Sequence, residues 1–187
     1  MALPVTDVVI RRAEERDLAA LGRLGASLMR THYAFDERRF MSPGDDPESG
    51  YAHFLSQQLN KPSSLVLVAE RGQPTERREP VKRASTDAER RAVPPGEVMG
   101  YVYASVEPQS WKELRDEAGF VHDLMIAGEA REAGVGKQLL EAAIEWLREQ
   151  GMPRVVLWTA APNDVARRLF ERRGFRPTMI EMTIELE

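Results

Sequence analysis

A loop with two closely spaced glycines and a cationic side chain precedes the most strongly patterned amphipathic segment of the chain. In REAGVGKQLLEAAIEWL, Gly134, Gly136 and Lys137 come directly before apolar residues at helical spacing. The first amides of a helix have no partner within the helix, and the aligned peptide dipoles make that end attractive to anions. Glycines also remove side chains where a ligand would meet Cβ atoms. The pattern therefore predicts a phosphate or pyrophosphate site at the start of this helix.

The spacing of this loop excludes two common phosphate-binding motifs. A dinucleotide-binding fingerprint requires a third glycine three residues after the second, where this chain has Leu139. A Walker A motif requires glycine at the position of Arg131 and serine or threonine at the position of Gln138. On the loop residues alone, a tight strand-to-helix turn without a ligand is an equal alternative.

The totals of the chain are typical of an ordinary globular domain. The sequence has 187 residues, of which 42% are hydrophobic and 30% charged, and it predicts a single domain over 1–187. The formal net charge of -4 gives no indication of nucleic-acid binding. Because there is no cysteine, disulfides, thiolate metal sites and a cysteine nucleophile are excluded. The sequence has no secretory leader and no bilayer-spanning apolar run, so we expect a cytoplasmic protein without membrane contacts.

Hydrophobic periodicity predicts the elements that must position the loop. Alternating apolar and β-branched residues predict strands at 7–13, 63–70, 98–108, 120–127, 154–160 and 178–187. Helical spacing predicts helices at 17–33, 51–60, 135–150 and 164–174, with a short helical piece at 110–119. Residues 72–96 contain four prolines and charges of both signs, which predicts a flexible insertion. The order of the elements predicts an α/β (α+β) fold in which helices cover a mixed sheet.

Two segments around the loop resemble the GNAT superfamily of acyl-CoA-dependent N-acyltransferases. The loop, with Arg131, Gly134 and Gly136, is similar to the family's Arg/Gln-x-x-Gly-x-Gly/Ala signature. The downstream segment NDVARRLFERRGF resembles a second family motif through Asn163, Ala166, Leu169, Phe170, Glu171, Gly174 and Phe175. The start of the chain, IRRAEERDLAAL, is similar to the family's first strand and helix. The resemblance covers essentially the whole chain in order, and it makes an empty turn a minor alternative.

This resemblance implies a fold, a cofactor and a reaction. The implied fold is a mixed, mostly antiparallel central sheet of about six to seven strands, with helices on both faces and splayed central strands. The implied reaction is transfer of an acetyl group from acetyl-CoA, or of another short acyl group, to a primary amine without a metal. The amine, on a small molecule or a protein, would attack directly in a ternary complex. The implied cofactor-binding residues are Leu124, Met125, Ile126, Arg131, Glu132, Ala133, Gly134, Val135, Gly136, Lys137, Asn163 and Phe170.

Acyl transfer to an amine requires a base for the amine proton, and His122 is our candidate. It lies on the strand that leads into the loop, nine residues before Arg131, where some relatives look to have a glutamate. Imidazole can take a proton near neutral pH, directly or through water. A histidine that only shapes the strand or the substrate pocket is the alternative interpretation.

One departure from the family pattern concerns the proton that the thiolate of CoA must receive. The position of the family's usual tyrosine donor is Phe170 in this chain, and phenylalanine has no proton to give. Another hydroxyl, such as that of Tyr101, Tyr103 or Thr159, is one replacement, and water is another, since a thiol of pKa about 8.5 needs little help. A non-catalytic acyl-CoA-binding regulatory module is the competing hypothesis from a different functional class.

The acceptor side is predicted only in outline. His32 and Tyr33 follow the first helix, in a region that shapes the acceptor pocket in similar proteins. Asp123 either faces the other side of the sheet from His122 or reaches a substrate amine through an irregularity of the strand. The resemblance also allows a homodimer in which the terminal strand at 178–187 pairs across an interface, although an ordinary edge strand explains its alternation equally well.

Overall fold

The computed structural model describes residues 8–72, 96–130 and 134–186. Its strands are β1 (Val8–Arg12), β2 (Ser64–Arg71), β3 (Val98–Glu107), β4 (Ala118–Ile126) and β5 (Val155–Leu157). Its helices are α1 (Leu18–Phe35), α2 (Pro47–Leu59), α3 (Val135–Glu149) and α4 (Asp164–Arg172), with short 3-10 turns η1 (Glu15–Asp17) and η3 (Gly128–Ala130). The predicted flexible insertion at 72–96 lies almost wholly outside the described residues.

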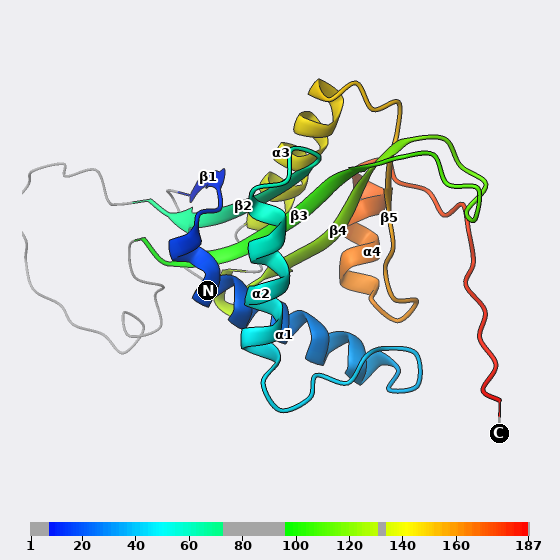
Figure 1. Cartoon of the computed structure of the whole chain (residues 1–187), viewed down its shortest axis with the longest axis horizontal. Coiled ribbons are helices and arrows are strands. Elements are labelled where there is room, and N and C mark those ends of the chain that lie inside the picture. Colours follow the sequence, from blue (N-terminus) through cyan, green and yellow to red (C-terminus); the bar gives the residue numbers. More distant parts are fainter. Residues whose placement is uncertain (1–7, 73–95, 131–133, 187) are drawn as a thin grey trace, which may run out of the picture.

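The five described strands form one sheet in the order β1-β2-β3-β4-β5, in which the first four are antiparallel and β5 is parallel to β4 (Figure 1). This confirms the predicted mixed, mostly antiparallel sheet, with fewer strands than the six to seven expected. Pairing between β4 and β5 covers only three residue pairs, from Gly119↔Val155 to Val121↔Leu157. Because β4 continues to Ile126 while β5 ends at Leu157, the two strands part beyond this point.

A β-bulge interrupts β4 where the pairing with β5 ends. Across β3, Tyr103 is opposite Asp123 and Ala104 is opposite Val121, so His122 is the extra residue. An extra residue breaks the strict alternation of side chains between the faces of a sheet. As a result, His122 and Asp123 both contact side chains on the α1 and α2 side.

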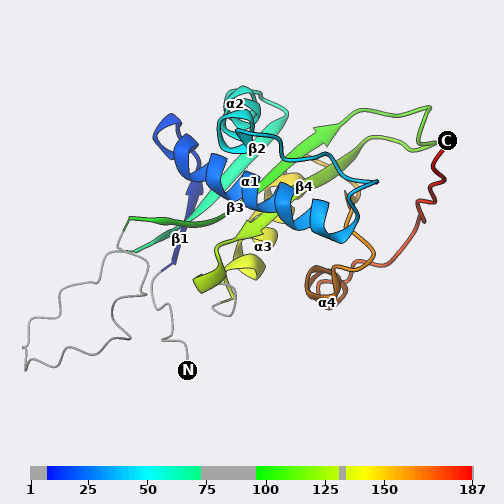
Figure 2. The same ribbon diagram turned by 90° about the horizontal axis from the view of Figure 1, so that it is seen from below.

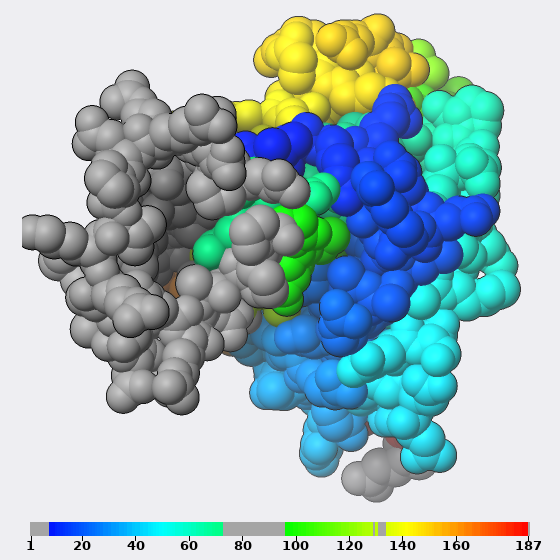
Figure 3. All heavy atoms as spheres, turned by 90° about the vertical axis from the view of Figure 1, so that its left-hand side faces the viewer, coloured from blue at the N-terminus to red at the C-terminus, as the bar shows by residue number. Residues whose placement is uncertain are grey.

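Helices cover both faces of the sheet, as predicted. On one face, α1 and α2 pack against buried side chains of β2, β3 and β4. On the other face, α3 and α4 cover a larger apolar cluster in which Leu139, Leu140 and Leu147 are fully buried. Figure 2 shows α1 and α3 on opposite sides of the strands, and Figure 3 shows α3 (yellow) separated from α1 and α2 (blue and cyan).

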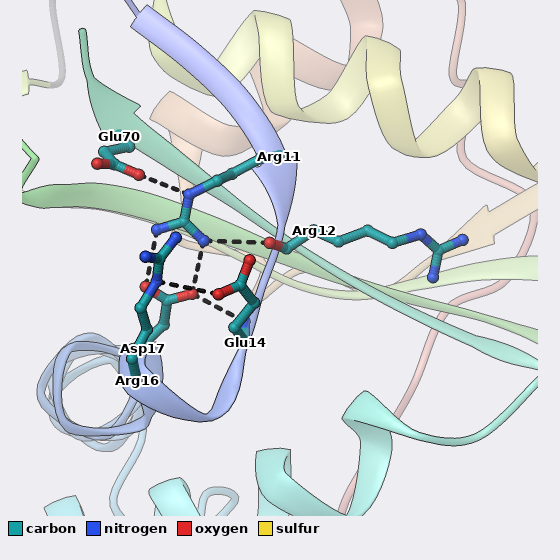
Figure 4. A network of polar contacts seen from close by, with 6 residues as sticks. All are labelled: Arg11, Arg12, Glu14, Arg16, Asp17 and Glu70. Carbon is teal, nitrogen blue, oxygen red and sulfur yellow. Dashed lines mark hydrogen bonds and ion pairs between the residues drawn. The ribbon is translucent and has the colours of Figure 1, made fainter. Parts of the chain in front are cut away.

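A polar network fixes the start of α1 to the sheet (Figure 4). The guanidinium of Arg11 on β1 donates hydrogen bonds of 2.7 and 2.9 Å to Asp17 and one of 2.5 Å to Glu70 on β2. The Asp17 carboxylate also accepts from the backbone amide of Glu14 at 2.8 Å. Burial opposes ionisation of Asp17, but the hydrogen bonds from Arg11 and Glu14 outweigh it and lower its pKa. The charge of Asp17 is therefore part of the fold.

Two predicted elements are wrong. Residues 110–119 do not form a helical piece, because the hairpin between β3 and β4 closes through hydrogen bonds between Ser110 and Arg115, and β4 already begins at Ala118. Residues 178–186 form no strand, although their apolar residues alternate. All of residues 176–186 are exposed, so the final described segment has no packing partner that would fix it as a strand.

Candidate active site

Helix α3 begins directly after Gly134, where the sequence predicted a helix start. Gly134 precedes the helix with φ 74° and ψ 8°, a left-handed conformation that glycine adopts without strain. Val135 is fully buried and holds the helix start against the sheet, while Lys137 is exposed in the first turn. A Cβ added to Gly136 would lie 3.5 Å from Ile126 and 3.7 Å from Leu169, which is ordinary contact. The fold therefore does not itself require glycine at 136.

The three residues before Gly134 lie outside the described residues. They are Arg131, Glu132 and Ala133, which the resemblance implies as pyrophosphate contacts. The described part of the candidate cradle therefore consists of Gly134 and the first turn of α3.

The end of β4 lies beside this helix start. Leu124 and Ile126 pack in the apolar cluster of α3 and α4, whereas Met125 is buried on the α1 and α2 side. The structure thus brings the three β4 residues implied as cofactor contacts to the segment where β4 has parted from β5. A chain-like ligand that entered here would meet the backbone of β4 and the start of α3.

Two residues of the second motif, Asn163 and Phe170, have structural roles in α4. The Asn163 side chain caps α4, because its Oδ1 accepts a hydrogen bond of 3.2 Å from the amide of Ala166. Phe170 is 8% exposed and packs edge-on against Phe175 with ring centroids 5.9 Å apart. The ring of Phe170 thus holds α4 on the sheet.

His122 stands in an aromatic and polar setting on the α1 and α2 side. Its ring is stacked between Tyr103, at 4.7 Å, and Phe120, at 5.7 Å. Ser105 donates its single proton to Glu107 Oε1 at 2.6 Å, so it can only accept from His122 Nε2, which lies 2.7 Å away. With these donor and acceptor roles, the neutral ring of His122 carries its hydrogen on Nε2 and its lone pair on Nδ1.

Asp123 is a partly buried carboxylate held by two phenols. Tyr51 of α2 donates to its Oδ2 at 2.6 Å and Tyr101 of β3 donates to the same atom at 3.0 Å. Among the residues that the structure describes, none donates to Oδ1 of Asp123. Burial raises the pKa of Asp123 above its ordinary value, while the two phenols and the imidazoles of His122 and His32 partly offset this rise.

The phenols in this cluster keep their protons. Burial and the charge of Asp123 raise the pKa of both Tyr51 and Tyr101. Tyr103 donates to Gln58 of α2 at 3.3 Å, and burial likewise raises its pKa. These hydroxyls are donors to fixed acceptors, so none of them is a ready proton source for a departing thiolate.

The two residues predicted after the first helix lie within its last turns. Nδ1 of His32 donates to the carbonyl of Leu28 at 3.0 Å, and the ring centroid of His32 lies 5.0 Å from that of Phe40. Tyr33 lines an open hollow of about 410 Å³ formed by residues 33–38. Neither His122 nor Asp123 lines this hollow.

The sequence did not single out four of the residues that surround His122 and Asp123. They are Tyr51, Gln58, Ser105 and Glu107. For Tyr51 the sequence held one indirect sign, the glycine at position 25 in α1. Gly25 leaves room for the ring of Tyr51, because a Cβ there would lie 1.9 Å from a ring atom. The positions of Gln58, Ser105 and Glu107 depend on strand register and helix packing, and no short sequence motif predicts these.

The sequence and the fold match proteins of one family. Residues 32–175 match the acetyltransferase (GNAT) family model. A mycothiol acetyltransferase of Cellulomonas flavigena is 30% identical over 92 residues, which cover 46% of this chain and 26% of that protein. The chain therefore spans about a quarter of the mycothiol acetyltransferases that it matches. An uncharacterized N-acetyltransferase of Bacillus subtilis, YhfO, is 26% identical over 169 residues and is covered to 88%.

Solved structures show the same fold. A Trypanosoma brucei acetyltransferase superposes with a TM-score of 0.60 at 20% identity, covering 96% of this chain and 100% of the other. The aminoglycoside antibiotic 6'-N-acetyltransferase of Acinetobacter haemolyticus has a TM-score of 0.62 at 16% identity, covering 96% and 98%. The fold of the solved structures and the family model agree. The chain belongs to the GNAT acetyltransferase family, whose members use acetyl-CoA as cosubstrate and act on amine acceptors.

In the described ranges, no group of three or more histidine, aspartate or glutamate side chains is arranged to hold a metal ion. None of the helices there combines the length and the apolar composition needed to cross a bilayer.

Proposed function

We propose that this protein transfers the acetyl group of acetyl-CoA to a primary amine by direct attack in a ternary complex. The observation that carries the proposal is the pair of features on β4: the strand parts from β5 beside the start of α3, and its bulge turns His122 and Asp123 toward the opposite side. A cofactor site and an acceptor site on two sides of one strand would place thioester and amine close together.

The cofactor side uses backbone groups and the positive end of a helix. The first amides of α3 offer donors to a pyrophosphate, and Lys137 adds a cation in the same turn. Arg131 through Gly136, the end of β4 and Asn163 are the remaining contacts that we assign to acetyl-CoA. Val135, buried under the helix start, contributes rigidity and its amide.

The base is His122, acting through Nδ1. The amine nitrogen forms a bond to the acetyl carbonyl carbon as the carbon–sulfur bond breaks, and Nδ1 takes the proton that the amine loses. The hydrogen bond from Nε2 to Ser105, and from Ser105 to Glu107, stabilises the positive charge that the ring then carries. Because Phe170 is a packing residue, water supplies the proton to the departing thiolate.

The acceptor is a cationic amine that Asp123 helps to bind. Its ammonium group gives one proton to water, and the neutral amine then attacks and gives its second proton to His122. Oδ2 of Asp123 is held by Tyr51 and Tyr101, so Oδ1 is the oxygen available to an ammonium group. A partly buried carboxylate favours a cation over a neutral ligand. His32 and Tyr33, at the end of α1, are the residues that would select the rest of the acceptor.

A panel assay that follows free CoA thiol tests this proposal. We would supply acetyl-CoA with a simple alkyl amine, a polyamine, an aminoglycoside or a lysine peptide, and compare the wild type with Asp123→Asn. We expect thiol release with at least one amine and a higher KM for that amine in Asp123→Asn. Absence of release for the whole panel, together with absence of acetyl-CoA binding in calorimetry, would refute the proposal.

A further inference from the structure

A row of aromatic rings on the α1 and α2 side of the sheet passes through His122. The rings of Phe54, Tyr103, His122, Phe120 and Trp158 follow one another, and the centroids of neighbouring rings lie 4.7 to 5.8 Å apart. Tyr103 and Phe120, inside the row, are buried, whereas Trp158 at one end is 71% exposed. The row therefore joins the proposed base to an exposed aromatic surface.

Trp158 lies where β4 and β5 have parted. It directly follows β5, whose last residue, Leu157, packs in the apolar cluster of α3 and α4. Successive side chains of an extended chain point to opposite faces of a sheet. In agreement with this, Trp158 contacts Phe120, whose ring stacks on His122. The indole is thus on the same side of the sheet as His122, beside the proposed acceptor site.

Packing within the chain leaves most of this indole uncovered. Phe54, at the other end of the row, lies between Tyr51 and Tyr103 and is only 41% exposed. Trp158 meets Phe120 edge to face, at an interplanar angle of 75°, and this contact covers little of its surface. An aromatic side chain offers a large apolar area and a preferred ring-to-ring geometry to a bound group. Trp158 is therefore the ring of the row that a ligand can cover.

The charged groups along this row are already paired. The guanidinium of Arg115 lies over the ring of Phe120, 4.5 Å from its centroid, and donates to Glu113 at 2.6 Å. Glu107 accepts the hydroxyl proton of Ser105, also at 2.6 Å. Neither carboxylate is free for a second ammonium group, and the guanidinium would repel one. The part of the acceptor that lies along the row is therefore neutral.

We propose that the acceptor is a primary amine on a short alkyl chain that ends in an aromatic ring, and that Trp158 binds this ring. The inference rests on the proposed function, in which Asp123 holds the ammonium group and His122 takes a proton. Phe120 alone separates Trp158 from His122, so a chain of a few carbon atoms reaches from one place to the other. Trp158 is then a specificity-determining residue, which selects the ring and takes no part in the proton transfer.

A matched pair of amines tests the role of Trp158. Phenethylamine and cyclohexylethylamine share one carbon skeleton, but only phenethylamine has a flat aromatic ring. With release of free CoA thiol as the measurement, we expect the KM of the wild type to be about fivefold lower for phenethylamine. Trp158→Ala should lose this preference, and Trp158→Phe should keep most of it. The control Trp111→Ala removes an indole that is 83% exposed between β3 and β4, and it should keep the preference. Equal KM values for the two amines in the wild type, or the same preference in Trp158→Ala, would overturn the proposal.

Binding measured without turnover separates this inference from the proposed reaction. The chain has three tryptophans, so single variants assign their indole N–H signals in NMR spectra. Titration with phenethylamine should shift the signal of Trp158 and leave that of Trp111 in place. Thiol release by the wild type without a shift at Trp158 would refute the aromatic site and leave the reaction standing. A saturating shift at Trp158 without thiol release from any amine would refute the reaction and support the site.

Discussion

The two sides of the sheet differ in how their chemistry is built. On the α3 and α4 side, the described core residues are apolar, and the features proposed to bind a ligand are backbone groups at a helix start. On the α1 and α2 side, Tyr51, Tyr101, His122 and Asp123 form a cluster of polar side chains. In the proposed function, the first side holds acetyl-CoA through backbone groups, whereas the second side selects and deprotonates the acceptor through side chains.

The largest expected effect is a loss of turnover when His122, on the α1 and α2 side of the sheet, is replaced. His122→Ala removes the proposed base, and the loss of a general base lowers turnover by about 10²-fold to 10⁴-fold. Steady-state assays over a pH series, with the amine that the panel identifies, would measure it. Because His122 lies on the acceptor side, the affinity for acetyl-CoA should be unchanged. Equal turnover in wild type and variant at every pH would remove His122 from this role.

A matched pair of glycine substitutions compares the packing of the two sides. In Gly25→Ala the new Cβ would lie 1.9 Å from a ring atom of Tyr51, so Tyr51 must move, at a cost of about 1–3 kcal/mol. In Gly136→Ala the nearest atom would lie 3.5 Å away, and the free energy of unfolding should hardly change. Urea denaturation of both variants measures this difference. Equal stability of the two variants would show that α2 does not depend on the close approach at Gly25.

Removal of a single phenol should weaken the acceptor side alone. Tyr51→Phe leaves Asp123 with the hydrogen bond from Tyr101, and we expect a loss of about 1–2 kcal/mol in the free energy of unfolding. The pKa of Asp123 should rise further, because one group that stabilises its charge is lost. Thermal denaturation gives the stability, with Tyr33→Phe as the control. A loss of the same size in Tyr33→Phe would mean that the Asp123 contact is not the cause.

The smallest effect concerns the network that anchors α1. The pKa of Asp17 is lowered in the folded state, so its charge stabilises the fold above the unfolded-state pKa of about 4 and this contribution is lost as the pH falls through the folded-state value. Asp17→Asn should cost about 1 kcal/mol at neutral pH. Denaturation curves from pH 7 to pH 2 should show the difference between wild type and variant shrinking below pH 4. A difference that stays constant would assign it to packing instead of charge.

The start of α3 could be predicted from the sequence because its signals are local, while its role in binding acetyl-CoA stays a prediction. The positive φ of Gly134 and the buried start of α3 follow from residues that are neighbours in the chain. Apart from the helical piece predicted at 110–119, the order of strands and helices through Phe175 follows from hydrophobic periodicity in the same way. The described helices α1 to α4 all occupy predicted helical regions, although α2 begins at Pro47, earlier than the pattern indicated.

The acceptor side could not be predicted because it depends on contacts between distant residues. The bulge that brings His122 and Asp123 to one face arises from the register of β4 against β3, and the sequence alone left open whether the two side chains face opposite sides. Tyr51 reaches Asp123 from 72 positions away in the chain. The strand predicted at 178–187 shows the opposite failure, because its alternation is clear while residues 178–186 are exposed and form no strand.

Calorimetric titration of acetyl-CoA into the wild type, Gly136→Ala and His122→Ala tests the division between the two sides most directly. The account predicts that the wild type and His122→Ala bind with equal affinity, and that Gly136→Ala, whose fold tolerates the methyl group, binds more weakly because that group meets the cofactor. Unchanged binding in Gly136→Ala together with lost binding in His122→Ala would contradict it.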